Sequence, residues 1–206
     1  MHLLMWDNAR MNSVERIRGH FEHSSRLILD AAEPLSAPIS KAADQILQCV
    51  MSDGKVLACG NGGSAAIAQK WVSEMINRFE QERPGLAAIA LATDTSTLTA
   101  IANDYAYNQV FSRQIAALGQ PGDVLMAIST SGNSDNVVRA AQTARQRDMP
   151  VVALTGRDGG NLAEQIGDND VLICVPADNA ARIQEIHLLI IHCLCDLVDS
   201  VLLGVA

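Results

Sequence analysis

The chain has 206 residues, a length that suits one α/β domain with a sizeable core. Hydrophobic residues make up 49% of it but aromatic residues only 3%, which argues against an aromatic-rich all-β domain and favours small aliphatic side chains between helices and a parallel sheet. The net charge of −8 disfavours a nucleic-acid backbone or an anionic membrane as the main partner, although small anions can still bind to backbone N–H groups.

The N-terminal part of the chain predicts a tail and two helices. The first residues contain only a short apolar run and do not resemble a signal peptide. Met11 is an alternative start, and residues 1–12 are expected to form a tail. Helical patterns follow at 13–32 and 36–52. Ser36 is the candidate N-cap of the second helix, and Gly54 lies just beyond its end.

The remainder predicts one domain, 13–206, whose α/β core covers about 55–206. Five apolar runs typical of buried strands recur in it, each followed by turn-forming residues and mostly by a helical pattern. This alternation predicts βαβ units and a parallel sheet with helices on both faces, closed by a long helix over about 179–203. The runs are KVLACG (55–60), LAAIAL (86–91), DVLMAI (123–128), PVVALTG (150–156) and DVLICVP (170–176).

The late apolar segment is interpreted as part of a soluble protein. Four polar or charged residues interrupt it, and such residues are costly inside a bilayer. The cysteines form no CxxC pair and no secreted disulfide framework, which indicates a reducing compartment. We therefore expect a cytoplasmic protein. The interrupting residues are His187, His192, Asp196 and Asp199, and the cysteines are Cys49, Cys59, Cys174, Cys193 and Cys195.

Three polar turns follow predicted strands, where ligands of open parallel sheets bind. They are CGNGGSAA (59–66), NDYAYN (103–108) and STSGNS (129–134), the last with Ser134 as a candidate helix cap. The first and third combine peptide N–H groups at a helix start with hydroxyls, which can surround a phosphate without Lys or Arg. The turns match neither GxxxxGK[ST] nor GxGxxG, so a phosphorylated small molecule is favoured over a nucleoside triphosphate or a dinucleotide.

Two predicted helices contain groups for proton transfer. Lys70 and Glu74 are four residues apart and so lie on one helix face, while Gln184 and His192 project from broadly the same side of the closing helix. An exposed ion pair and a hydrogen-bonded core histidine remain the alternatives. A carboxylate and an imidazole across a phosphate-binding pocket would suit aldose–ketose isomerisation, with His or a metal opposite the developing oxyanion.

Five motifs in order make the chain resemble the sugar isomerase (SIS) domain family, in particular its phosphoheptose isomerase subgroup, from about residue 13 to 200. The resemblance implies a doubly wound, five-stranded parallel sheet flanked by helices, a flavodoxin-like three-layer sandwich, in a homotetramer with active sites shared between subunits. It also implies conversion of sedoheptulose 7-phosphate to D-glycero-D-manno-heptose 7-phosphate, the first step towards lipopolysaccharide heptose. The motifs are CGNGGSAA, TDTSTLTAIANDYAY, GDVLMAISTSGNSDNV, VVALTGRDGG and ARIQEIHLLIIHCLCDLVD.

Site residues follow from the same resemblance, position by position. Glu74 corresponds to the general base and His192 to the general acid. The implied phosphate and sugar binders are Asn61, Gly62, Gly63, Ser64, Asn103, Asp104, Ser129, Thr130, Ser131, Ser134 and Gln184.

The chain departs from the family at the metal site. Family members commonly bind zinc through a His, the catalytic Glu, a Gln and the catalytic His, of which Glu74, Gln184 and His192 are present here. Lys70 occupies the fourth position, and a protonated ammonium is no zinc ligand. Lys70 is therefore a candidate charge substitute for the metal. The family's usual Asp is replaced by Ile67, which removes a further polar group.

A relative in the same subgroup leaves a second function open. The bacterial replication-initiator-associating protein is a tetramer of this fold that binds the initiator and promotes its assembly at the origin. The stretches MINRFEQERP, RDMPVVALTG and CLCDLVD resemble that relative as much as the isomerases. Its Glu and second His positions are substituted, whereas this chain keeps Glu74 and His192, which favours catalysis.

Overall fold

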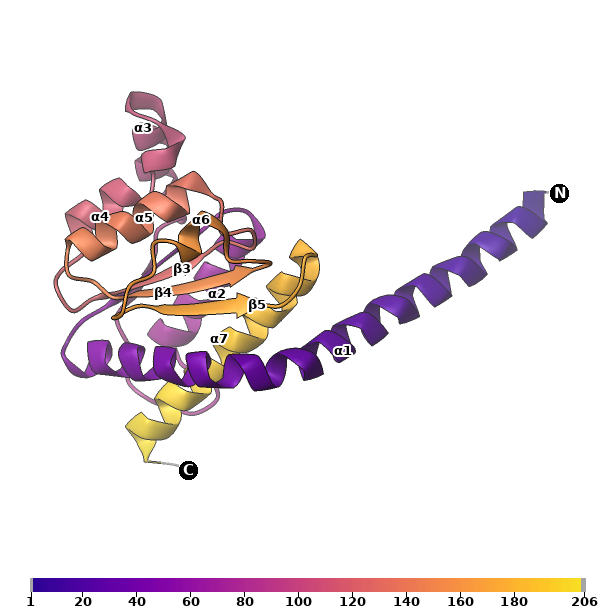
Figure 1. Cartoon of the computed structure of the whole chain (residues 1–206), viewed down its shortest axis with the longest axis horizontal. Helices are drawn as coiled ribbons and strands as arrows, with labels where there is room; N and C mark the ends of the chain where they lie inside the picture. The colour runs from indigo at the N-terminus through magenta and orange to yellow at the C-terminus, as the bar shows by residue number, and fades with distance from the viewer. Residues whose placement is uncertain (1, 205–206) are drawn as a thin grey trace.

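The computed structural model describes the backbone of residues 2–204 and the side chains of residues 12–204. Its centre is one parallel sheet in the strand order β2-β1-β3-β4-β5 (Figure 1). Each strand lies within one of the five predicted apolar runs, which confirms the predicted fold class. The strands are β1 (Val56–Gly60), β2 (Ala88–Ala90), β3 (Val124–Ile128), β4 (Val151–Gly156) and β5 (Val171–Val175).

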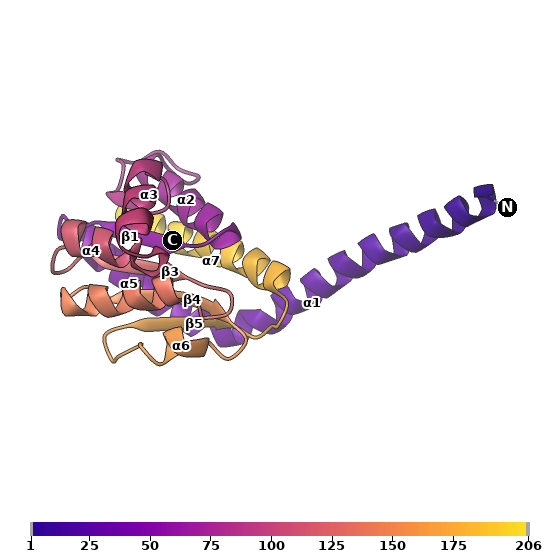
Figure 2. The same cartoon turned by 90° about the horizontal axis from the view of Figure 1, so that it is seen from above.

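Helices cover both faces of this sheet, which gives the three layers (Figures 1 and 2). Helices α1, α2 and α7 pack on one face, and α4, α5 and α6 pack on the other. The bounds are α1 (His2–Met51), α2 (Gly63–Ile76), α3 (Thr95–Asp104), α4 (Ser112–Leu118), α5 (Asp135–Gln146), α6 (Gly160–Ala163) and α7 (Ala180–Leu203), with a 3₁₀ turn η1 (Tyr107–Gln109).

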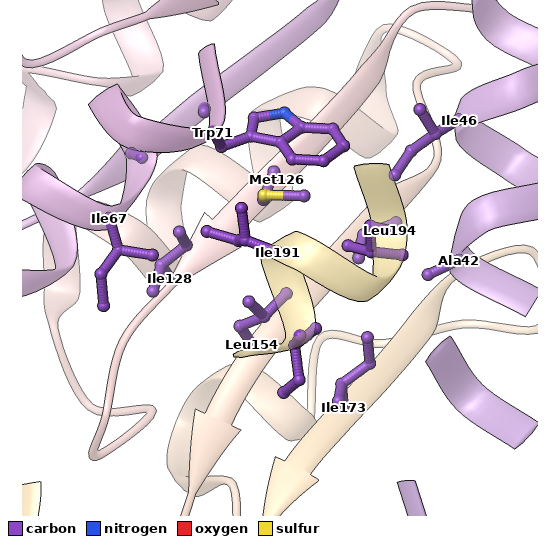
Figure 3. Close-up of a cluster of buried hydrophobic side chains, with 14 of the residues drawn as sticks. Ala42, Ile46, Ile67, Trp71, Met126, Ile128, Leu154, Ile173, Ile191 and Leu194 are labelled. Atoms are coloured by element: carbon purple, nitrogen blue, oxygen red, sulfur yellow. The ribbon is translucent and has the colours of Figure 1, made fainter. Parts of the chain in front are cut away.

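Alternate residues of each strand feed two separate cores. Met126 and Ile128 of β3 join the core under α1, α2 and α7, while Leu125 and Ala127 face α4 and α5. Figure 3 shows the first of these cores, with Trp71 of α2 above Met126. Because both faces of every strand are buried, the strands read as continuous apolar runs rather than as alternating patterns.

Helix α1 is one continuous helix, so the prediction of two helices at 13–32 and 36–52 is wrong. Pro34 and Pro38 lie inside it, and Ser36 caps nothing: its hydroxyl donates to the carbonyl of Ala32 at 2.7 Å. A proline removes one intrahelical hydrogen bond, but a buried stripe at every fourth residue crosses this region and stabilises the helix through packing. The stripe is Leu27, Ala31 and Leu35. The division into a tail (1–12) and a domain stays a prediction.

Helix α7 begins one residue after the start of the predicted helix. Asn179 caps it, accepting from the backbone N–H of Ala181 at 2.9 Å. Among the described residues, α7 is long and apolar enough to cross a membrane, but such a test also detects the core helices of soluble proteins. One side of α7, with Ile183, Ile190 and Leu194, is buried against the sheet and its neighbouring helices.

Candidate functional site

The strand order reverses between β1 and β3, and the first and third predicted turns leave the sheet at this point. Gly60 at the end of β1 pairs with Ile128 at the end of β3, so the two turns start side by side. Helix α2 then runs back along one face of the sheet and α5 along the other. This is the crevice where open α/β sheets bind ligands. We call residues 61–64 and 129–134 the switch-point turns.

Asn61 of the first polar turn bonds to the second polar turn and to the start of α5, the helix that follows the third turn. Its side-chain amide and that of Asn136 exchange two hydrogen bonds, of 2.8 and 2.9 Å. The hydroxyl of Tyr107, from the second turn, donates to the same Asn61 oxygen at 3.1 Å. The sequence analysis selected Asn61 but missed Asn136, because an amide on the first turn of a helix resembles an ordinary polar surface residue.

The helices that follow the switch-point turns have no side-chain caps. Gly62 is the N-cap of α2 and has no cap side chain. Ser134 occupies the N-cap position of α5, yet its hydroxyl accepts from Ser129 at 3.2 Å and bonds to no helix amide, so its predicted capping role is wrong. Thr130 has no side-chain hydrogen bond among the described residues. N–H groups and hydroxyls therefore remain available to an anion at both helix starts.

The backbone that follows β4 fixes the conformation of the third turn. Gly132 has a φ of +65°, and a Cβ there would lie 1.8 Å from the carbonyl oxygen of Gly159. The N–H of Leu162 donates to the Gly132 carbonyl at 2.8 Å, and the N–H of Asn161 donates to the Asn133 side chain at 3.0 Å. Only glycine fits this approach, so the turn has its shape before any ligand binds.

The other predicted binders of the second turn lie apart from this crevice. Asn103 and Asp104 end α3, which has no buried residue and stands off the body of the domain (Figure 1). Both are exposed, and the Asn103 amide donates to the Asp104 carboxylate at 2.9 Å. Other residues of the second turn do reach the crevice: Tyr107 bonds to Asn61, and the Asn108 amide donates to Asp135 at the start of α5 at 2.7 Å.

Lys70 and Glu74 form an ion pair on the second half of α2. The Glu74 side chain is 12% exposed, whereas that of Lys70 is 45% exposed. The carboxylate is therefore largely buried, and the ammonium is partly exposed to solvent. The Glu74 carboxylate also affects a thiol on α7. Burial, followed by the nearby Glu74 and Asp199 carboxylates, raises the pKa of Cys195 to about 12. Cys195 is therefore no nucleophile at neutral pH.

A buried charge pair that the sequence analysis missed fixes the end of α2 beside Glu74. The Arg83 guanidinium donates to Asp199 of α7 at 2.5 Å, and to the backbone carbonyls of Glu74 at 2.9 Å and Met75 at 3.0 Å. In the sequence, Asp199 stands out only as a charged residue inside an apolar segment, because a single sequence does not show which residue Asp199 contacts. We call Lys70, Glu74, Arg83 and Asp199 the α2–α7 charge cluster.

Gln184 and His192 lie at different places along α7. The Gln184 amide packs on the first switch-point turn, where a Cβ on Gly63 would be 2.6 Å from its Nε2 atom. The His192 ring stacks on Phe79, with 5.6 Å between ring centroids and 27° between planes. Eight residues of helix, about 12 Å, separate the two backbone positions.

These contacts do not fit the family's zinc site. Lys70 Nζ bonds to Glu74, Gln184 lies on Gly63, and His192 stacks on Phe79, so the three possible ligands face three different neighbours. Within residues 12–204, no group of three or more His, Cys, Asp or Glu side chains could hold a metal ion. Ile67, at the family's Asp position, is buried in the apolar core near Ile128 (Figure 3).

His187 is the histidine of α7 with a structural role. It is fully buried, and its Nε2–H donates to the backbone carbonyl of Thr155 at 2.9 Å. Burial lowers the pKa of His187 to about 4, although the Thr155 hydrogen bond opposes this shift. The ring is therefore neutral at pH 7 and joins α7 to the end of β4.

Comparisons with known proteins show the family and the fold of the chain. The model of the SIS domain family matches residues 20–156. The chain is 68% identical to the phosphoheptose isomerase of Thiobacillus denitrificans over 191 residues, 93% of this chain and 97% of that protein. It superposes on the phosphoheptose isomerase structure from Neisseria gonorrhoeae with a TM-score of 0.86 at 55% identity, covering 90% of this chain and 98% of that one. The Francisella tularensis structure gives 0.89 at 45% identity, covering 91% and 98%.

Proposed function

Since the chain belongs to the SIS domain family and, within it, to the phosphoheptose isomerases, we propose that it interconverts sedoheptulose 7-phosphate and D-glycero-D-manno-heptose 7-phosphate. The observation that best supports this proposal is the junction at Asn61, where the first turn bonds to the second turn and to the start of α5 at the point where the strand order reverses. The product would supply heptose for lipopolysaccharide, which requires a cytoplasmic enzyme.

The switch-point turns are proposed to bind the phosphate. The starts of α2 and α5 have no side-chain cap and follow the adjacent strands β1 and β3, and an anion at a helix start needs no cationic side chain. Thr130 and Ser131 offer hydroxyls beside these amides, while Ser129 and Ser64 are buried and shape the turns. The Gln184 amide, which packs on Gly63, is proposed to bond the sugar.

Glu74 and His192 are proposed to move the protons. In the ketose, the Glu74 carboxylate takes a proton from C1, the C–H electron pair forms the C1–C2 double bond, and the carbonyl electrons move to O2. His192 then donates a proton to O2, and the enediol loses its O1 proton to the imidazole. The protonated Glu74 returns its proton to C2, which gives the aldose with atoms and charges balanced.

The proposed enzyme is a homotetramer with shared active sites. Gly63 and Glu74 are eleven residues apart on α2, about 16 Å, so the binding turns and the base of one chain lie at opposite ends of the helix. A second copy supplying Glu74 or His192 would resolve this separation. Large apolar side chains on α1 support self-association, and the N-terminal half of α1 projects away from the body (Figures 1 and 2). They are Val14, Ile17, Phe21 and Leu29, all more than half exposed.

The direct test is incubation of the purified protein with sedoheptulose 7-phosphate and detection of the aldose by NMR or by a coupled assay. We expect turnover that is saturable in substrate. Undetectable turnover by the assembled protein, with and without added zinc, would contradict the proposed function.

A second candidate function is a tetrameric scaffold that binds the replication initiator and a sugar phosphate with little catalysis. Lys70 at a metal-ligand position and the exposed apolar face of α1 favour it. A pull-down of the initiator tests it. Association that is weakened by Phe21→Ser but not by Glu74→Gln would support the scaffold, and absence of association in a sensitive assay would exclude it.

A further inference from the structure

The replacement of a zinc ligand by Lys70 leads to a further inference, which rests on the proposed function. We propose that the Lys70 ammonium neutralises the charge that develops on the substrate, so that the isomerisation proceeds without a bound metal. The first support is the site itself. Lys70 is bonded to Glu74, the residue that would take the substrate's proton, and the three possible zinc ligands face different neighbours.

The Lys70 ammonium has more N–H groups than its bond to Glu74 uses. Lys70 bonds through one N–H to the largely buried Glu74 carboxylate, and the Lys70 side chain is 45% exposed. An ammonium has three N–H groups, so two remain for oxygen atoms of a substrate that reaches this side of α2.

The charge of the pair changes with the reaction. Before proton transfer, the carboxylate and the ammonium together have no net charge, so they hardly favour the bound substrate electrostatically. When Glu74 takes the C1 proton it becomes neutral, and the positive charge of Lys70 is no longer compensated. At that moment the substrate becomes an enediolate with one negative charge. The pair therefore interacts more strongly with the transition state than with the ground state, which is the condition for catalysis.

The backbone around the pair is fixed at both ends. The Ser73 hydroxyl donates to the carbonyl of Lys70 at 2.7 Å, and Arg83 donates to the carbonyl of Glu74 at 2.9 Å. Arg83 is itself buried against Asp199. The turn of α2 that presents the pair thus keeps its geometry while the charge on Glu74 changes.

Stability alone is a weak reason for this pair. Exposed ion pairs contribute roughly 0–1 kcal/mol, and Lys preceding Glu by four residues is the less favourable order on a helix. The pair of Asp135 and Arg139 is also four residues apart but has both side chains exposed, and it provides a control because it lies on α5, on the opposite face of the sheet.

The experiment compares wild type with Lys70→Met, Lys70→Arg, Lys70→His and the control Arg139→Met. Steady-state turnover of sedoheptulose 7-phosphate is measured before and after chelation, and zinc binding is measured by calorimetry and by elemental analysis. We expect wild type to bind no stoichiometric zinc and to keep its activity in chelator. Lys70→Met should lower kcat by about 10²-fold or more with a small change in KM. Lys70→Arg should restore most of kcat, whereas Lys70→His should bind no stoichiometric zinc, because Gln184 and His192 still face different neighbours.

Three results would overturn the inference: stoichiometric zinc in wild type that is lost in Glu74→Gln, loss of wild-type turnover on chelation, or unchanged kcat in Lys70→Met. A fall in kcat for Arg139→Met as large as that for Lys70→Met would also count against a specific role of the charge. Absence of turnover in wild type under every metal condition contradicts the proposed function and the charge role together. Zinc binding by wild type contradicts this inference alone.

Discussion

The switch-point turns and the α2–α7 charge cluster differ in the kind of side chains that they contain. The turns contain no charged side chain and are assembled from glycines, amides and hydroxyls, fixed by the Asn61–Asn136 exchange and by the contact of Gly132 with Gly159. The cluster contains four charged side chains, with Arg83 and Asp199 almost fully buried. A site for a permanent anion benefits from neutral dipoles, whereas a site where charge appears during the reaction requires charges that stay in place.

Glu74→Gln should separate the two regions most clearly. It removes the proposed base but keeps a side chain of the same shape, so turnover should fall by about 10²–10⁴-fold. Binding of the sugar phosphate, measured by calorimetry, should persist because the switch-point turns are untouched. Loss of binding together with turnover would show that the two regions are not separate.

Arg83→Met tests whether the cluster depends on its buried pair. The substitution leaves Asp199 buried without its partner, so the free energy of unfolding in urea should fall by about 3–5 kcal/mol. Arg139→Met, in an exposed pair, should change it by roughly 0–1 kcal/mol. The double variant Arg83→Met with Asp199→Leu should regain part of the loss. Equal effects of the two single variants would argue against this account.

Gly132→Ala applies the corresponding test to the turns. A Cβ would collide with the Gly159 carbonyl and would also need a left-handed backbone, so stability should fall and binding of inorganic phosphate should be lost. Gly122→Ala is the control, since Gly122 also has a positive φ but open space around it; its cost should be only about 1–2 kcal/mol. If Gly132→Ala still binds phosphate, the third turn is not part of the proposed phosphate-binding site.

The pH dependence of stability tests His187, which joins α7 between the two regions to β4. Its pKa is about 4 in the folded protein and 6.5 ordinarily, so between these values the unfolded chain binds a proton that the folded chain does not. Stability should therefore fall as pH decreases from 6.5 to 4, by at most about 3 kcal/mol. His187→Gln should flatten this part of the unfolding free-energy curve. If the unfolding free energy of the variant depends on pH as steeply as that of the wild type, groups other than His187 cause the pH dependence.

Tyr107→Phe should have the smallest effect. It removes only the hydroxyl that donates to Asn61, so KM should rise about 2- to 10-fold, as for the loss of one hydrogen bond, with kcat nearly unchanged. Tyr105→Phe is the matched control, because Tyr105 is similarly exposed and its ring contacts Arg113 rather than Asn61. Equal KM values in both variants would remove the second turn from the binding site.

The sequence predicted the turns far better than the cluster, for a physical reason. Apolar runs ending in Gly, Ser and Asn are local patterns, and parallel pairing brings the ends of β1 and β3 together without further information. The partnership of Arg83 with Asp199 joins residues 116 positions apart, and nothing in either local pattern reveals it. The continuous α1 was missed because Pro34 and Pro38 are locally helix-breaking, and only the packing of Leu27, Ala31 and Leu35 outweighs them.

The projecting half of α1 has one further consequence. Val14, Ile17 and Phe21 are each more than half exposed among the described residues, and short isolated helices are marginal in water. In the proposed tetramer the helicity of this segment therefore depends on the protein concentration, whereas that of α7 is fixed by the core. On dilution, far-ultraviolet circular dichroism should lose signal in proportion to dissociation, which makes the first helix of the chain a built-in reporter of assembly.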